Sequence, residues 1–147
     1  MINYRFKYFG LAIVLVAVAF TVLYFGFNFR FEMTVFAVHS AFFETKMFAL
    51  FKTNFADELI LILYLTGLAL MMFSKEKNES AVVMQKRHDA MRYAFFINLL
   101  IQLFVILFIY GQGFIAFLVL NLINLPLLYL ALFFIMKRDL NEQKIQE

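Results

Sequence analysis

Four amide side chains stand out in the C-terminal half of the chain, because residues 93–136 contain no charged residue. Asn98 and Gln102 are four residues apart, and Asn121 and Asn124 are three apart. On a helix, either spacing places the two side chains on one face. Amides buried in lipid need partners, and interhelical hydrogen bonds of this kind average about 0.6 kcal/mol. The four residues therefore predict a polar zipper between two helices, with an oligomer contact, a pore lining and a ligand site as alternatives.

A basic cluster precedes the first of these amides. It consists of Lys86, Arg87, His88 and Arg92. Basic residues next to an apolar run anchor the cytoplasmic end of a span and contact anionic lipid headgroups. The sharper alternative is a docking site for a cytosolic partner.

The remaining polar candidates lie before and at the start of the second apolar run. They are His39, Glu44, Asp57 and Glu58. Asp57 and Glu58 follow Asn54, as expected for acidic residues in the first turn of a helix. A lipid-acting enzyme using these four groups is the third functional hypothesis. We assign no catalytic residue, since adjacent carboxylates point to different sides of a helix.

Several chemistries are excluded by what the chain lacks. It has no cysteine and only two histidines, so a standard zinc site cannot be assembled. It contains no Gly-rich phosphate loop and no G-x-S-x-G elbow, and we expect no metal and no cofactor. The net charge of +3 does not predict nucleic-acid binding, because the charges border the apolar runs. The absence of ionisable residues in the middle of these runs argues against an ion-coupled transporter.

The elements that must position these residues are predicted by hydropathy. The chain is 65% hydrophobic and only 16% charged, whereas soluble domains carry about 25% charged residues. Four apolar runs are each long enough to cross a bilayer, at about 8–29, 55–73, 93–110 and 114–136. The predicted fold is all-α: a membrane-embedded four-helix bundle in one domain, 1–147.

Three connections complete the predicted fold. Only residues 111–113 separate the last two runs, which predicts a tight hairpin that brings the two amide pairs to similar depth. Residues 80–92 predict a helical extension continuous with the third span, a rod of about 45 Å. Residues 31–52 are mixed, Phe-rich and free of Gly and Pro; they predict a helix in the membrane interface, or else a re-entrant segment.

The distribution of Lys and Arg predicts the orientation. Ten of the 13 lie before the first span, in the 74–92 loop and after the fourth span, and three lie in the 30–52 segment. The positive-inside rule then places both termini in the cytoplasm.

Several short segments together resemble a known group of proteins: YRFKYFG, FSKEKNES, YAFFINLL, YGQGF and LVLNLINLPLL, in this order. The chain is similar to an uncharacterised family of small four-helix integral membrane proteins of Bacteroidota bacteria. The resemblance implies the multi-pass topology and a bacterial inner-membrane location, and it implies no activity.

The leading functional hypothesis is a small non-enzymatic membrane protein that works through assembly. It would act as a subunit, as an accessory factor or as a homo-oligomer, with the lipid bilayer and other membrane subunits as partners. The first alternative is a homo-oligomeric channel or membrane-perturbing effector whose path is lined by the amides. The lipid-acting enzyme is the second alternative.

Overall fold

The computed structural model describes residues 2–40, 46–77 and 79–146, without the side chains of 37–40, 46, 47, 49, 51 and 141–146. The described residues form four helices, α1 (Arg5–Gly26), α2 (Ala56–Phe73), α3 (Ala81–Phe108) and α4 (Gln112–Gln146). Each of these helices is long and apolar enough to cross a membrane. The prediction of four such helices is confirmed at this level.

The first pair of helices, α1 and α2, packs through glycine. A Cβ atom added at Gly10 would lie 2.6 Å from the carbonyl oxygen of Gly67, and one added at Gly67 would lie 2.7 Å from Val14. Ala17 is fully buried on the same helix. Small residues let two helix backbones approach closely, which is a common basis of helix pairing in membranes. The two helices therefore form a tight antiparallel hairpin.

The second pair, α3 and α4, is joined at Gly111, whose φ of +69° is readily adopted by glycine. Helix α3 begins at the N-cap Ser80, whose hydroxyl accepts a hydrogen bond from the Val83 amide at 3.3 Å. It covers both the 80–92 extension and most of the 93–110 run without interruption. Helix α4 continues through Pro126, as membrane helices allow when neighbouring groups satisfy the freed carbonyl.

The segment between α1 and α2 is a β-hairpin, so the prediction of an interfacial helix over 31–52 was wrong. Strand β1 (Glu32–Ser40) pairs antiparallel with β2 (Lys46–Asn54), in a register that matches Met33 with Thr53 and Phe36 with Leu50. The physical reason is composition. Phe, Val and Thr favour a pleated, half-buried surface, and the two nine-residue runs satisfy backbone N–H and C=O groups by pairing over most of their length.

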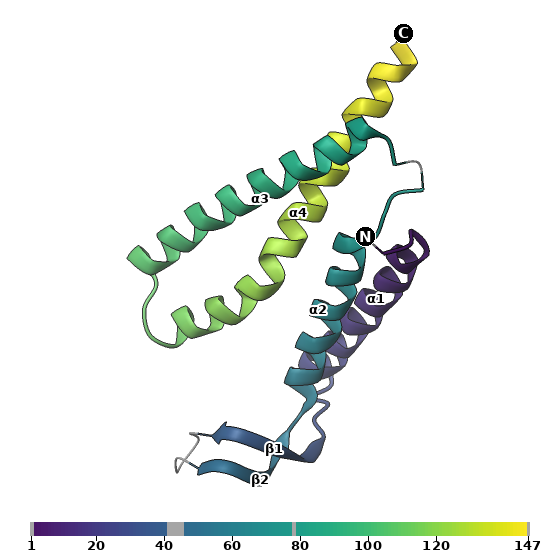
Figure 1. The fold of residues 1–147 in the computed structure, drawn as a ribbon. Coiled ribbons are helices and arrows are strands. Elements are labelled where there is room, and N and C mark those ends of the chain that lie inside the picture. Colours follow the sequence, from purple (N-terminus) through teal and green to yellow (C-terminus); the bar gives the residue numbers. More distant parts are fainter. Residues whose placement is uncertain (1, 41–45, 78, 147) are drawn as a thin grey trace.

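The two helical hairpins are in contact through α2 and α4. They diverge from the end that holds the N-terminus and the 74–80 connection, and the β-hairpin lies at the opposite end of α1 and α2 (Figure 1). A buried cluster fixes this junction: Ala90 and Ala94 of α3 pack with Tyr129 and Phe133 of α4, and Met72 of α2 packs against them. The amides and the charged groups described next lie on either side of this cluster along α4.

Candidate functional site

The four amides form two hydrogen-bonded pairs between α3 and α4. Asn124 Nδ2 donates to Asn98 Oδ1 at 2.8 Å, and Asn121 Nδ2 donates to Gln102 Oε1 at 2.6 Å. Asn98 is buried, and the other three are half-buried. The amides are thus engaged with one another, which holds the two helices of this hairpin at a fixed rotation and register.

A second polar centre lies in the connection between α2 and α3. Glu76 accepts a hydrogen bond from Lys137 Nζ at 2.6 Å through one carboxylate oxygen and one from Lys7 Nζ through the other. Its side chain is 9% exposed, whereas the two lysines are about one-third exposed. Lys7 belongs to α1 and Lys137 to α4, so one carboxylate ties both helical hairpins together. We call these three residues the Glu76 clamp.

The electrostatics of the clamp favour the ionised carboxylate. Burial raises the pKa of Glu76, but the hydrogen bonds and charges of Lys137 and Lys7 outweigh this effect and hold the pKa below its ordinary value of 4.5. A buried carboxylate that lost both partners would carry the full cost of its desolvation. The clamp is therefore a structural ion-pair network, built to hold a charge in place.

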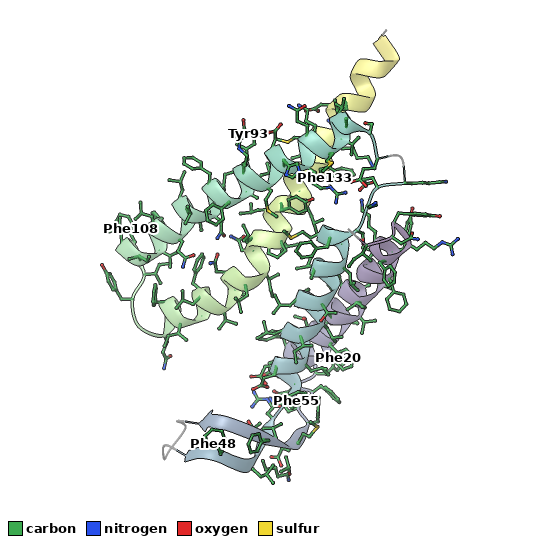
Figure 2. All side chains as sticks on the ribbon, in the orientation of Figure 1. Phe20, Phe48, Phe55, Tyr93, Phe108 and Phe133 are labelled. Atoms are coloured by element: carbon green, nitrogen blue, oxygen red, sulfur yellow. The ribbon has the colours of Figure 1, made fainter. Side chains whose placement is uncertain are left out.

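Arg87 closes the same region from α3. Its Nη1 donates to the Ser74 carbonyl at 3.0 Å, and its Nη2 lies 3.5 Å from Glu79 Oε1. The guanidinium also stacks over the ring of Phe133 at 5.3 Å from the centroid, a cation–π contact. Figure 2 shows Phe133 at the level of the α2–α3 connection.

The basic cluster expected from the sequence does not form one surface. Arg87 is buried, while His88 and Arg92 are exposed. Arg92 lies 3.6 Å from Asp89 on the outside of α3, and Lys86 is half-buried. Arg87 of α3 therefore faces the other helical hairpin, where it contacts Ser74. The other three basic residues point to other sides of α3.

The candidates before and at the start of α2 are placed only in part. Asp57 and Glu58 lie in the first turn of α2, where Asn54 accepts from the Ala56 amide at 3.4 Å and its Nδ2 lies 3.5 Å from Asp57 Oδ1. Glu44 and the side chain of His39 lie outside the described residues. Within the described residues there is no group of three His, Cys, Asp or Glu that could hold a metal ion.

Sequence reasoning missed the Glu76 clamp. Its members are 69 and 61 residues apart, so no spacing rule relates them. The available signal was an acid flanked by Lys75 and Lys77, in a connection that also contains Glu79. Such a mixture of charges is equally typical of a solvated loop.

Comparison with known proteins gives no relative to guide the assignment. No family model, no curated protein and no solved structure matches this chain.

Proposed function

We propose that this chain is a non-enzymatic, multi-pass integral membrane protein that works by assembling with another transmembrane helix, from a second copy or from a different subunit. The proposal includes the bacterial inner membrane as its location and a cytoplasmic position for both termini. The charge distribution supports this orientation, because the Glu76 clamp and the basic 74–92 segment lie at the end that the positive-inside rule assigns to the cytoplasm.

The observation that carries the proposal is the divergence of the two helical hairpins. The most apolar window of each helix is only 11% to 22% buried within the chain. The hairpins meet through α2 and α4 near the N-terminus and separate toward the β-hairpin (Figure 1). In this arrangement α2 and α4 come into contact only near the junction, and a further helix beside them would bury more of both.

The engaged amides support a packing role over a pore lining. In each pair the donor and the acceptor lie on facing helices of one hairpin. Lining a conducting path would require these groups to leave each other and turn toward water. A rigid hairpin held by internal hydrogen bonds is instead suited to presenting a fixed apolar surface to a neighbour.

Site-specific photo-crosslinking in native membranes tests the proposal. Leu61 lies seven residues before Leu68, which is buried, and Ile123 lies seven residues before Leu130, which lines the junction between the hairpins. A spacing of seven keeps the same helix face. A photoreactive amino acid at either position should therefore capture a polypeptide. Leu15 of α1, 62% exposed, is the matched control and should capture lipid only.

The capture of protein at Leu61 and Ile123 but not at Leu15 would support assembly, and mass spectrometry of the adduct would separate a second copy from another subunit. Lipid adducts alone at all three positions would overturn the proposal. Extraction with alkaline carbonate tests embedding separately, because an integral protein stays in the membrane pellet.

A further inference from the structure

Two adjoining cavities lie where α1, α2 and α4 meet, next to the Glu76 clamp. The first has a volume of about 390 Å³ and the second about 300 Å³. Both are lined by Lys7, Met71 and Lys137. They therefore form one recess at the junction of the two helical hairpins, with two compartments.

The walls of the first compartment are apolar. They are formed by Met71 of α2 and by Leu130, Phe133 and Phe134 of α4. Phe134 is 69% exposed, so this compartment opens sideways from the helices, toward the region that lipid tails occupy in a membrane. Its size is suited to a section of hydrocarbon chain.

The rim of the recess is strongly basic. Lys7, Lys137 and Arg138 line the first compartment, and Lys75 and Lys77 join the lysines in the second. Glu76 is the single acid that lines either compartment. Its single negative charge is smaller than the positive charge of the four lysines that line the recess, so the lining carries an excess of positive charge.

We propose that this recess binds one anionic phospholipid, with the phosphate at the lysine-rich rim and an acyl chain against Met71, Leu130 and Phe134. Basic pockets between transmembrane helices on the cytoplasmic side recognise anionic headgroups in this way. The proposal rests on membrane embedding, as does the proposed function, but not on assembly with a partner. Lipid at this junction would reinforce the contact between the hairpins, because α1, α2 and α4 all supply lining residues.

The combination of walls and rim distinguishes a lipid from a soluble phosphate. A free phosphate would use the cations but would gain nothing from the apolar compartment. A neutral lipid would use the apolar compartment but would leave the excess positive charge uncompensated. An anionic phospholipid uses both.

Native mass spectrometry of the full chain, purified in a neutral detergent, tests the site. Three probes are added in turn: dioleoyl phosphatidylglycerol, dioleoyl phosphatidylcholine and glycerol 3-phosphate. We expect phosphatidylglycerol to bind at one molecule per chain. Its affinity should be at least about tenfold higher than that of either other probe, because each Lys or Arg near an anionic headgroup contributes about 1 kcal/mol.

A double variant, K77Q/R138Q, removes two rim cations and leaves Lys7 and Lys137 in place for Glu76. The affinity for phosphatidylglycerol should fall roughly 25-fold, at about fivefold for each charge. The matched control, K86Q/R92Q, removes two positive charges from α3, outside the recess, and should retain the wild-type affinity. A thermal melt of both variants checks that the fold is kept.

Three results would overturn the proposal. The first is equal affinity for the two dioleoyl lipids, and the second is glycerol 3-phosphate binding as tightly as phosphatidylglycerol. The third is an equal loss of affinity in the two double variants, which would indicate general attraction to a basic protein. None of these results bears on the crosslinking at Leu61 and Ile123, so failure of the lipid site and failure of assembly are distinguishable.

Discussion

Asn98 carries a buried amide whose oxygen accepts a hydrogen bond from Asn124, and the energy of this contact can be measured. A double-mutant cycle with Asn98→Ala and Asn124→Ala should give a coupling energy of about 0.6 kcal/mol, with an upper bound near 1.7. Asn124→Ala alone should cost more than its share of the coupling, because it leaves a buried acceptor without its partner. The readout is the unfolding free energy in mixed micelles.

A cycle between Asn98 and Asn121, which belong to different pairs, is the control. Its coupling should be smaller than that of the bonded pair. A coupling near zero for Asn98 and Asn124 would contradict the hydrogen bond between them.

Protonation of Glu76 should lower the stability of the folded chain. Its pKa is lower in the folded chain than its ordinary value of 4.5, so the folded state favours the ionised form. The clamp therefore contributes its full stability above about pH 4.5, and this contribution is lost as the pH falls through the lowered value. The melting temperature should drop in that window, and the drop should be smaller in Glu76→Gln.

The same variant should destabilise the chain at neutral pH. Removing one partner of a fully buried ion pair costs about 3–5 kcal/mol, but the lysines here are about one-third exposed and regain water. We expect a loss of about 1–2 kcal/mol for Glu76→Gln. Asp139→Asn, an exposed change on α4, is the control and should leave the melting temperature nearly unchanged. Equal pH profiles for wild type and Glu76→Gln would count against the clamp.

The two polar centres differ in whether a sequence pattern predicts them. Asn98 with Gln102, and Asn121 with Asn124, are close in sequence, and the short turn fixes their depth, so the pattern predicts two amide pairs at similar depth. Lys7, Glu76 and Lys137 come from three elements, and their meeting depends on how the two helical hairpins pack. No local rule specifies that contact.

At the level of helices, the contact between α1 and α2 depends on Gly10 and Gly67. Gly67→Val should push the two helices apart, because even a Cβ atom there would lie 2.7 Å from Val14 and 2.9 Å from the Gly10 carbonyl oxygen. Overpacking of this kind costs about 1–3 kcal/mol. The hydrogen-bond contact between Thr21 and Tyr64, now 3.3 Å, should lengthen with it.

Gly26→Ala is the matched control, because nothing lies within 4 Å of the added Cβ atom. In the same detergent, the melting temperature should fall for Gly67→Val and stay close to the wild-type value for Gly26→Ala. A Gly67→Val chain as stable as the control would mean that the helices are not in close contact there.

The segment 31–52 shows why element type was harder to predict than element position. Its boundaries follow from the apolar runs on either side. Its type depended on whether Phe, Val and Thr line one face of a helix or one face of a strand. A short mixed run fits both the helical period of about 3.6 residues and the strand period of about 2. Pairing between two runs of equal length favoured strands, and pairing is a non-local property that one run does not reveal.

For the molecule as a whole, the topology is the first property to test. Reporter fusions after Lys77 and after Leu140 should be active in the cytoplasm, and a fusion after Ser40 should be active outside. The expectation follows from four crossings and from the excess of Lys and Arg on one side. An external signal after Leu140 would mean that one of the four helices does not cross the membrane.

Hydropathy predicts the number of helices because each apolar run must be covered by lipid or protein. It does not predict the angle between the two helical hairpins. That angle depends on a few contacts around Tyr129, Phe133 and Arg87 at one end of the molecule. No sequence pattern distinguishes these side chains from others of their type. Their role follows from their position in the packed junction.

The position of Lys137 in the chain also sets an order of events during synthesis. Lys7 and Glu76 are both made before α3, so the first helical hairpin and half of the clamp can form before α3 and α4 are complete. Lys137 follows Glu76 by 61 residues, which the ribosome adds in roughly 3 to 12 seconds. During this interval Lys137 is not yet made, so Lys7 is the one member of the clamp with which Glu76 can pair. Once Lys137 has been made, its ion pair with Glu76 connects the second helical hairpin to the first.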